Sequence, residues 1–455
     1  MKTGAQYRAS LHDGRATYFE GKRIDDLEGD PILGPTVDEV AATYDRFFSA
    51  EPSATSPLMA VARSAEDLRA RLPVLHGADL VANVTYQSIM TLMTAAARLG
   101  DCPAYVDQAQ QDDIRIVECI TDAKGDRSLL PARQHDPDLY VRVVDRSADG
   151  VVIRGAKLHI SGASYAHDLM TIPTKAMKAG EEAYAIAAMV PVSAPGVRIV
   201  NTTYAPRHGD PRTFPISSRH HMPEGFVIFD DVFVPNERVF LDGETHHAAV
   251  FAHALGLWER LGRLSAFVEE ADQLVGFAQL IAEANGLARE PHIREKISEM
   301  IIHATILRAG LEAAISNCRV TAEGAAFPDE LYTNAAKYYG AAHYNGMVRH
   351  LHDIAGGSVL TAPSVADLEN AEVGPLIRKY MSTGPDVDGE YRTRLFHAIR
   401  DLTADALGGW KAVTNLQAGG GLYAQRIVTR RFYDLAGAKR KALAHAGLEA
   451  PPAKR

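Results

Sequence analysis

The amino-acid sequence predicts an α+β protein with an N-terminal helical domain, a middle β-barrel domain and a C-terminal helical bundle. Three observations lead to this fold class. Apolar residues recur at helical spacing over 1–112, short β-rich runs separated by Gly, Pro and Asp fill 113–241, and helical spacing returns over 242–455. A length of 455 residues also fits about three domain-sized units. We therefore expect domain boundaries near residues 112 and 241.

The N-terminal domain is predicted to be mostly helical. Segments 38–48 and 64–72 carry apolar residues at three- and four-residue spacing. A longer apolar helix is expected over 85–99, ended by Gly100. The domain is therefore expected to consist mainly of amphipathic helices.

The middle domain is predicted to consist of short strands. The clearest runs are 139–144, 151–160, 184–190 and 226–229. The Asp149-Gly150 pair between the first two runs is a strong hairpin signal, because this dipeptide favours the turn that joins antiparallel strands.

The C-terminal part is predicted to be a bundle of long helices. Eight residues step alternately by four and three, which places them on one helical stripe: Ile293, Ile297, Met300, Ala304, Leu307, Leu311, Ala314 and Cys318. Cys318 is therefore interpreted as a small core residue. Further helices are expected over 329–352, 389–406 and 423–446, followed by a frayed tail from Pro451.

Composition excludes several classes of partner. A net charge of −9 and an isoelectric point near 6.1 argue against nucleic acid or an anionic membrane as the main partner. The N-terminus lacks the apolar region of a signal peptide, and no uncharged apolar run approaches 18 residues. Three widely spaced cysteines suit a reducing cytoplasm and give no disulfide framework. We expect a soluble cytoplasmic protein without a metal site.

Three motifs indicate a known family. A charged loop, Lys124-Gly125-Asp126-Arg127, precedes a strand with Gly155-Ala156-Lys157 and then Ser161, and the segment 229–240 reads FDDVFVPNERVF. Together these resemble the 4-hydroxyphenylacetate 3-hydroxylase / 4-hydroxybutyryl-CoA dehydratase family over most of the chain. The resemblance implies the acyl-CoA dehydrogenase-like architecture, which has the same order of helices, β-domain and helices. It also implies a homodimer or homotetramer, because such bundles are usually buried between subunits.

The resemblance further implies an FAD site at the charged loop. Gly125 lets the backbone approach a ligand closely, while Lys124 and Arg127 can make charge-assisted bonds to phosphate or to a flavin carbonyl. Ser161 is expected to donate near the flavin N5 or O4 edge. The alternative for the loop is a solvated turn, and for Ser161 a bond within its own turn. Neither a Rossmann fingerprint nor a P-loop pattern is present, so loops and helix ends would hold the dinucleotide.

Other ligand contacts are implied by the same resemblance. They are two flavin-contacting segments, Gly356-Gly357-Ser358 and Gln417-Ala418-Gly419-Gly420, and two residues of the substrate cavity, Lys175 and Ala176. Either glycine segment can equally be a helix C-cap, and Lys175 can equally be a solvated side chain.

Departures from the family pattern bear on the chemistry. The dehydratase branch binds a [4Fe–4S] cluster through three Cys and one His, but its paired Cys positions read Ala82 and Tyr86 here, and no Cys or His follows Trp258 over 259–273. Cluster irons need thiolates, so we expect no iron–sulfur cluster. The hydroxylase branch has Arg and Tyr at the same pair and a His where this chain has Glu118.

Two residues are therefore the expected catalytic groups. Tyr86 can hydrogen-bond a substrate oxygen at a position that Ala82 also lines, and Glu118, if shielded beside the flavin, can act as the general base. The alternatives are a core tyrosine and a surface carboxylate. Glu224, just before the 226–229 strand, is a second candidate base, with a solvated glutamate as its alternative.

The predicted function is a two-component flavin monooxygenase. Reduced FAD would come from a separate flavin reductase, and molecular oxygen would hydroxylate an aromatic or phenol-like small molecule. One alternative is a cluster-free FAD-dependent acyl-CoA isomerase, dehydratase or dehydrogenase that uses Glu118 or Glu224 as its base. A further alternative is a non-catalytic flavin-binding subunit.

Overall fold

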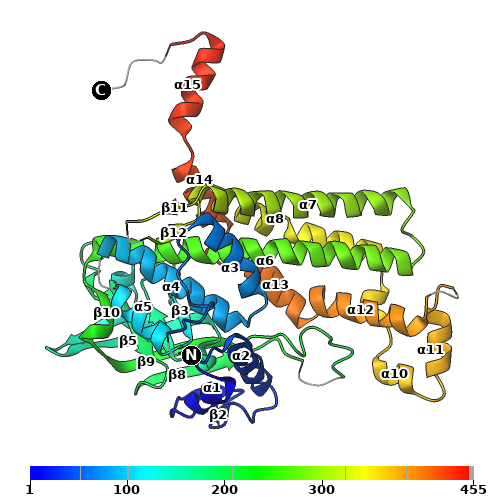
Figure 1. Ribbon diagram of the computed structural model, residues 1–455, viewed down its shortest axis with the longest axis horizontal. Helices are drawn as coiled ribbons and strands as arrows, with labels where there is room; N and C mark the ends of the chain where they lie inside the picture. The colour runs from blue at the N-terminus through cyan, green and yellow to red at the C-terminus, as the bar shows by residue number, and fades with distance from the viewer. Residues whose placement is uncertain (52, 100–101, 207–209, 323, 385–386, 450–455) are drawn as a thin grey trace.

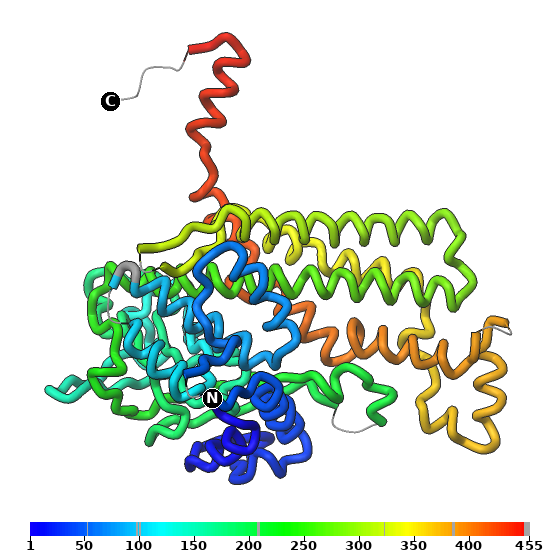
Figure 2. The backbone as a smooth tube through the Cα atoms, in the orientation of Figure 1, coloured from blue at the N-terminus to red at the C-terminus, as the bar shows by residue number. Residues whose placement is uncertain are grey.

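The computed structural model describes residues 1–51, 53–99, 102–206, 210–322, 324–384 and 387–449. Figure 1 shows β-sheets at one end of the molecule and long helices running away from them. The backbone trace in Figure 2 shows the N-terminal segment beside the sheets and the last helix projecting from the body. Among the described residues, no helix is both long and apolar enough to cross a bilayer.

The N-terminal segment is helical with one short hairpin. The predicted helices at 38–48, 64–72 and 85–99 are confirmed as α2, α3 and α4, while the predicted stop at Gly100 lies outside the described residues. The hairpin was not predicted, because strands of three residues are too short to show a period. The elements are α1 (Gly4–Ser10), β1 (Thr17–Phe19), β2 (Lys22–Ile24), α2 (Gly34–Phe47), α3 (Ala65–His76), α4 (Leu80–Leu99) and α5 (Cys102–Gln111).

The strands form two open sheets, whereas the sequence predicted one closed barrel. One sheet has the order β2-β1-β8-β9-β5-β4 and the other β10-β7-β6-β3, and apolar side chains from both share one core. The predicted hairpin is present, since β4 and β5 pair antiparallel. The middle strands are β3 (Ile116–Cys119), β4 (Arg142–Arg146), β5 (Gly150–Ser161), β6 (Asp168–Thr171), β7 (Ile186–Pro191), β8 (Val197–Thr202), β9 (Glu224–Pro235) and β10 (Val239–Asp242).

The C-terminal part is a helical bundle around one long buried helix, α6. Its members are α6 (Ala248–Ala284), α7 (Pro291–Ser316), α8 (Glu330–Ala355), α9 (Ser358–Thr361), α10 (Val365–Glu369), α11 (Gly374–Met381), α12 (Gly389–Thr403), α13 (Ala406–Gln417), α14 (Leu422–Phe432) and α15 (Leu435–Ala446), with a small hairpin of β11 (Arg319–Val320) and β12 (Ala326–Phe327).

Three helical predictions are corrected here. Helix α7 ends at Ser316, so Cys318 lies beyond it and is only partly buried. The predicted helix over 389–406 ends at Thr403, and α13 starts separately. The predicted helix over 423–446 is two helices, because the Asp434 side chain accepts the Gly437 N–H and caps a new helix. The predicted frayed tail lies outside the described residues.

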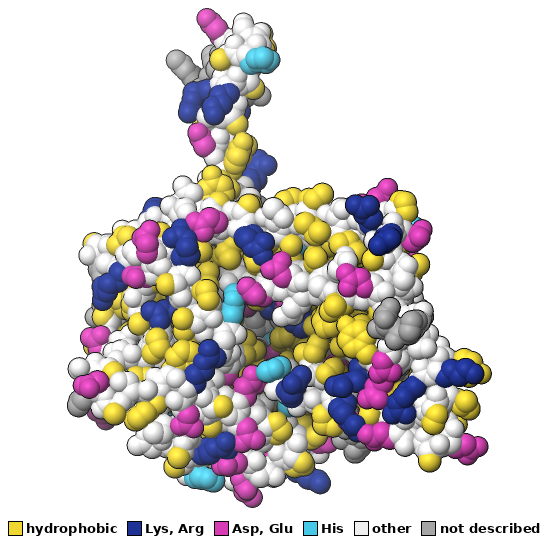
Figure 3. All heavy atoms as spheres, turned by 45° about the vertical axis from the view of Figure 1, so that its right-hand side comes forward, with side chains coloured by type: hydrophobic (Ala, Val, Ile, Leu, Met, Phe, Trp, Pro, Cys, Tyr) yellow, Lys and Arg dark blue, Asp and Glu magenta, His cyan; other side chains and the backbone are white. Residues whose placement is uncertain are grey.

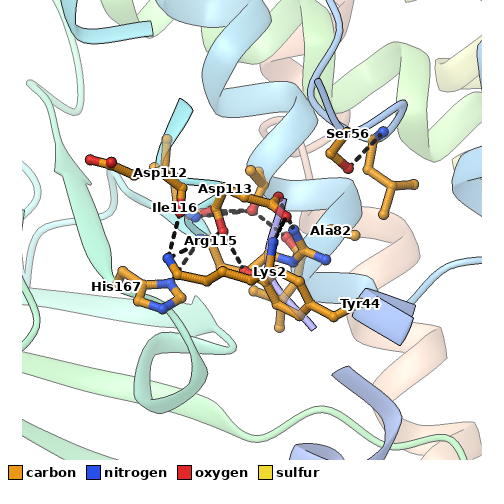
Figure 4. Close-up of polar contacts among 12 residues, drawn as sticks. Lys2, Tyr44, Ser56, Ala82, Asp112, Asp113, Arg115, Ile116 and His167 are labelled. Carbon is orange, nitrogen blue, oxygen red and sulfur yellow. Dashed lines mark hydrogen bonds and ion pairs between the residues drawn. The ribbon is translucent and has the colours of Figure 1, made fainter. Parts of the chain in front are cut away.

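A buried polar cluster attaches the N-terminus to the start of β3. The Lys2 N–H donates to the Asp113 carboxylate over 2.9 Å, and the Tyr44 hydroxyl donates to the Asp113 carbonyl over 2.8 Å. The Arg115 guanidinium lies 3.9 Å from the Tyr44 ring centroid, and its backbone N–H donates to His167. Figure 4 shows these side chains gathered beside α4. Since Arg115 directly precedes β3, the cluster fixes where that strand begins.

A buried ion pair supports the segment that follows β3. Lys157 on β5 and Asp122 are 2 % and 3 % exposed, and their charged atoms are 2.9 Å apart. The Lys157 ammonium also donates to the carbonyls of Ile120 and Ile172, each over 2.9 Å. Because a buried charge is tolerated only when it is paired and hydrogen-bonded, this lysine fixes the backbone just before the charged loop at 124–127.

The Lys157→Met variant is expected to lose about 3–5 kcal/mol of unfolding free energy, because it leaves the Asp122 carboxylate buried without its partner. Urea denaturation at neutral pH measures the loss. The double variant Asp122→Asn/Lys157→Met should recover most of it, whereas additive losses would contradict a coupled pair. Arg198→Met, which removes an exposed pair with Asp230, should cost less than about 1 kcal/mol.

Candidate active site

Three carboxylates from three elements converge beside α6. Glu118 lies on β3, Glu224 starts β9, and Glu259 lies on α6; Glu259 raises the pKa of each of the other two by charge repulsion. Burial is the larger cause, and it raises the pKa of Glu118 well above its ordinary value. One Glu118 carboxylate oxygen is buried and has no hydrogen-bond partner among the described residues. The charged form of this carboxyl is therefore disfavoured, and one of its oxygens is left for a ligand to contact.

Glu224 is held by hydrogen bonds from two other elements. The Ser161 hydroxyl donates to both Glu224 carboxylate oxygens, over 3.0 and 2.8 Å, and the Trp410 indole N–H on α13 donates over 3.1 Å. Burial raises the pKa of Glu224, and these bonds oppose the rise. Ser161 and Glu224 are direct partners in the β5–β9 register. Ser161 therefore contacts the second candidate base across the sheet instead of bonding its own turn.

Glu259 and Lys337 form a second proton-exchanging pair. Lys337 on α8 is fully buried and donates to the Asn415 carbonyl over 3.2 Å. Burial lowers its pKa to about 7, although Glu259 opposes this shift. Burial raises the pKa of Glu259, while the Gly419 backbone N–H and the Lys337 charge oppose the rise. Lys337 can therefore change protonation near neutral pH, and the Glu259 carboxyl holds its proton more readily than an exposed glutamate does.

Tyr86 and Ala82 lie on the buried face of α4. Tyr86 packs against Trp258, the residue that precedes Glu259 on α6. The Tyr86 ring meets the Trp258 ring edge-on at a centroid distance of 6.3 Å. Its hydroxyl is buried without a hydrogen-bond partner among the described residues, and burial raises its pKa. Arg71 on α3 is the charged group that most opposes this rise. Tyr86 and Glu118 thus face neighbouring residues of α6, and no described contact joins them directly.

The charged loop at 124–127 forms a cationic cluster with Lys175. Burial lowers the pKa of Lys124, and the nearby charges of Arg127 and Lys175 lower it further. Lys124 and Gly125 both have positive φ, +71° and +49°, so the loop folds back sharply. Asp126 instead caps the turn by accepting from Ser128. A cluster of cations on such a turn suits phosphate or another anion.

The predicted glycine segments lie far apart within one chain. Gly419 and Gly420 follow α13, and the Gly419 carbonyl accepts from Arg260, which also donates to Asn334 near the start of α8. Gly356 is the C-cap of α8 at the other end, with φ +80°. The helix between Asn334 and Gly356 is roughly 33 Å long. The segment at 417–420 therefore lies beside the carboxylate group, whereas Gly356, Gly357 and Ser358 do not.

Ala176, predicted to line the substrate cavity, is exposed beside Lys175.

A charged network clamps α13 onto α6. Glu270 is bonded by Arg263 (2.5 Å), Lys411 (2.7 Å) and the Asn415 amide (3.1 Å). Burial alone would raise the pKa of Glu270, but the two cations lower it to about 2. This network fixes the helix that carries Trp410 and leads into Gly419.

Sequence reasoning missed Glu259, Lys337 and Trp410. Glu259 follows Trp258 directly, in a stretch that was considered only for Cys and His ligands of a cluster. A glutamate there was therefore not predicted to be functional. Lys337 lies on the buried face of α8 beside Ala336, Gly340 and Ala341, and a lysine among such small residues was the available signal. Among the described residues, no three His, Cys, Asp or Glu side chains are arranged to hold a metal ion.

Comparisons with known proteins agree on one family. Models of the N-terminal and C-terminal parts of 4-hydroxyphenylacetate 3-hydroxylase match residues 3–241 and 248–447. The 4-hydroxybutyryl-CoA dehydratase/vinylacetyl-CoA-Delta-isomerase of Clostridium aminobutyricum is 27% identical over 99% of this chain and 100% of its own. The 4-hydroxyphenylacetate 3-monooxygenase oxygenase component of Thermus thermophilus is 26% identical over 90% of this chain and 89% of its own.

Solved structures match the whole fold. An oxygen-tolerant 4-hydroxybutyryl-CoA dehydratase from N. maritimus aligns with a TM-score of 0.88 at 26% identity, over 100% of this chain and 96% of its own. The oxygenase component of 4-hydroxyphenylacetate 3-monooxygenase, solved with FAD, aligns with a TM-score of 0.86 at 24% identity, over 98% of each chain. The acyl-CoA dehydrogenase-like fold is thus supported at the level of the whole chain.

The Glu118→Gln variant is expected to be more stable than the wild type at alkaline pH. When the folded-state pKa of a carboxyl is raised, the folded protein loses stability as pH rises above 4.5, the ordinary pKa of that carboxyl. Glutamine does not titrate, so the variant avoids this loss. Urea denaturation across the pH range measures the difference, which should vanish below pH 4.5. Glu237→Gln, at an exposed position, is the matched control. A pH-independent difference for Glu118→Gln would contradict a shielded carboxyl.

The Glu270→Gln variant is expected to lose about 3 kcal/mol of unfolding free energy at neutral pH, since the folded pKa of about 2 lies well below the ordinary 4.5. A depressed carboxyl pKa gives stability above pH 4.5 that is lost as pH falls toward 2, so the difference should shrink in acid. Glu283→Gln, exposed on the same helix, should leave stability unchanged. An equal loss in both variants would argue against the clamp.

Proposed function

Since this chain belongs to the 4-hydroxyphenylacetate 3-hydroxylase family, we propose that it is a two-component monooxygenase that uses reduced FAD to hydroxylate a phenol-like small molecule. The observation that carries this proposal is the shielded Glu118 carboxyl, whose free oxygen has no partner among the described residues. Glu118 lies on β3, the strand that leads into the cationic loop at 124–127. The proposed base and the proposed anion-binding turn are therefore neighbours along the chain.

The residues present fit an FAD. Lys124, Arg127 and Lys175 offer charge to a pyrophosphate. The oxygenase component of 4-hydroxyphenylacetate 3-monooxygenase has been solved in complex with FAD, and also with FAD and 4-hydroxyphenylacetate. The bound flavin would supply oxygen activation, while this chain would orient it, exclude water and manage the substrate proton.

This chain's own side chains can accept and transfer the substrate proton. Glu118 would accept it from a phenol hydroxyl, because burial raises its pKa and makes it a stronger base than an exposed glutamate. Glu259 and Lys337 would then take part in proton exchange behind it. Tyr86 would donate its free hydroxyl to a substrate oxygen. Ala82, one turn before Tyr86 on α4, would lie beside the same substrate oxygen.

The second candidate is a cluster-free acyl-CoA isomerase, dehydratase or dehydrogenase. The full-length match to 4-hydroxybutyryl-CoA dehydratase favours it, and Glu224 or Glu118 would remove a proton beside the thioester. We place it second because the resemblance implies paired cysteines of that branch at the positions where this chain has Ala82 and Tyr86. A non-catalytic flavin-binding subunit is the remaining alternative.

Rapid mixing of the protein and anaerobically reduced FAD with oxygenated buffer tests the main proposal. The bound flavin should reoxidise at least about tenfold more slowly than free reduced FAD, because the site excludes water, and phenols should gain one oxygen atom from labelled O2. Glu118→Gln should lower kcat by roughly 10²-fold, and exposed Glu237→Gln should not. Reoxidation at the free-flavin rate would overturn the proposal.

Two further outcomes separate the alternatives. Turnover of acyl-CoA with oxidised FAD and without oxygen consumption would establish the second candidate. Tight binding of reduced FAD with neither reaction would favour the non-catalytic subunit. We also propose a separate flavin reductase, because no nicotinamide-binding motif occurs in the sequence, and a cytoplasmic homodimer or homotetramer.

A further inference from the structure

We propose that Thr85 is a positioning residue that fixes Glu118 relative to Tyr86. The inference rests on the proposed function, in which Glu118 accepts the substrate proton and Tyr86 donates to a substrate oxygen. These two groups lie on different elements, β3 and α4, and no hydrogen bond joins them among the described residues. Thr85 connects the two elements at a point close to both groups.

Strand β3 is the end strand of its sheet. In the order β10-β7-β6-β3 it pairs with β6 alone, so its outer edge has no strand partner among the described residues. Buried peptide groups on such an edge must find partners elsewhere. Side chains provide them at two points: Thr85 bonds Ile116, and Lys157 donates to the Ile120 carbonyl over 2.9 Å. Glu118 lies midway between these two supports.

The Thr85 hydroxyl contacts both peptide groups of Ile116. It accepts the Ile116 N–H over 2.9 Å, and its own hydrogen is shared between the carbonyls of Val81 (2.8 Å) and Ile116 (3.1 Å). Figure 3 shows a surface of mixed charged, polar and hydrophobic side chains, whereas Thr85 and Ile116 are fully buried. Water therefore cannot replace this bond, which fixes the register of β3 against α4.

This register determines which way Glu118 points. Side chains alternate along a strand, so Ile116, Glu118 and Ile120 share one face. Ile116 and Ile120 pack into a core formed with α4 and α6, so the Glu118 side chain faces the same helices, and the Glu259 charge reaches it there. A slip of β3 by one residue would turn Glu118 to the opposite face.

The same bond locates Tyr86. Successive residues of a helix point about 100° apart, so Thr85 faces β3 while the Tyr86 ring faces Trp258 on α6. Tyr86 directly follows Thr85, and Glu118 lies two residues beyond Ile116. The two groups that lack hydrogen-bond partners among the described residues therefore stand on either side of one short connection.

A double-mutant cycle tests this connection without any assay of turnover. In the wild-type background, Glu118→Gln should stabilise the protein at alkaline pH. In the Thr85→Val background this gain should fall by at least about half, because valine keeps the shape of threonine but frees β3, and water then reaches the carboxyl. Urea denaturation across the pH range measures the gain. Thr91→Val is the matched control background and should leave it unchanged, since Thr91 is buried on the same helix and its hydroxyl has no partner among the described residues.

Turnover by the proposed monooxygenase gives a second measurement. Thr85→Val should lower kcat roughly tenfold and change KM by less than about twofold, because the base is misplaced while the substrate still binds. The acidic limb of the pH profile should also move to lower pH, as a more exposed Glu118 loses its proton more easily. Thr85→Ser, which keeps the hydroxyl, should restore both properties, and Thr91→Val should match the wild type.

Two results would overturn the positioning role of Thr85. One is a Glu118→Gln gain that is the same in the Thr85→Val and wild-type backgrounds, and the other is a serine variant that behaves like the valine variant. If Thr85→Val does not fold, hydrogen exchange in the wild type decides: the Ile116 amide should exchange as slowly as amides within β6, and fast exchange would overturn the proposal. Coupling without monooxygenase turnover would count against the proposed reaction and support the connection.

Discussion

The burial of charged side chains along α6 is the constraint on which the rest of the site depends. Charges removed from water must find partners, and those on α6 find them both on α6 itself and on other elements. Arg260 donates hydrogen bonds to the Gly419 carbonyl and to Asn334. Glu270 accepts hydrogen bonds from Arg263, Lys411 and Asn415. The bundle is therefore assembled so that α13 and the glycine turn after it are held against Glu259.

The site has an acidic half and a basic half that share one segment. Strand β3 carries Glu118 into the group of carboxylates beside α6, and the chain then reaches the cationic turn around Lys124 within a few residues. The Lys157–Asp122 pair fixes the backbone between them. This short connection keeps the proposed base, Glu118, close in the chain to the proposed anion-binding turn. That arrangement suits a reaction in which a bound dinucleotide and a substrate proton must be handled together.

Segments of α13 and α14 connect the site to the outer surface. Trp410 bonds Glu224 inside the site, Gly419 meets Glu259, and Gln425 on α14 donates to the Gly420 carbonyl. These contacts hold the end of α13, the glycine turn and the first part of α14 beside the carboxylate group.

The sequence by itself determined the order of elements, the family and the candidate groups Glu118, Glu224 and Lys124. Helical and alternating periods report which face of an element is apolar, and short motifs report local turns. Only the tertiary structure decided which groups meet: that Ser161 bonds Glu224 across a sheet, that Glu259 and Lys337 complete the acidic group, and that Gly356 lies at the far end of α8. These contacts join residues far apart in the chain, and no local pattern specifies which distant partner a buried charge will find.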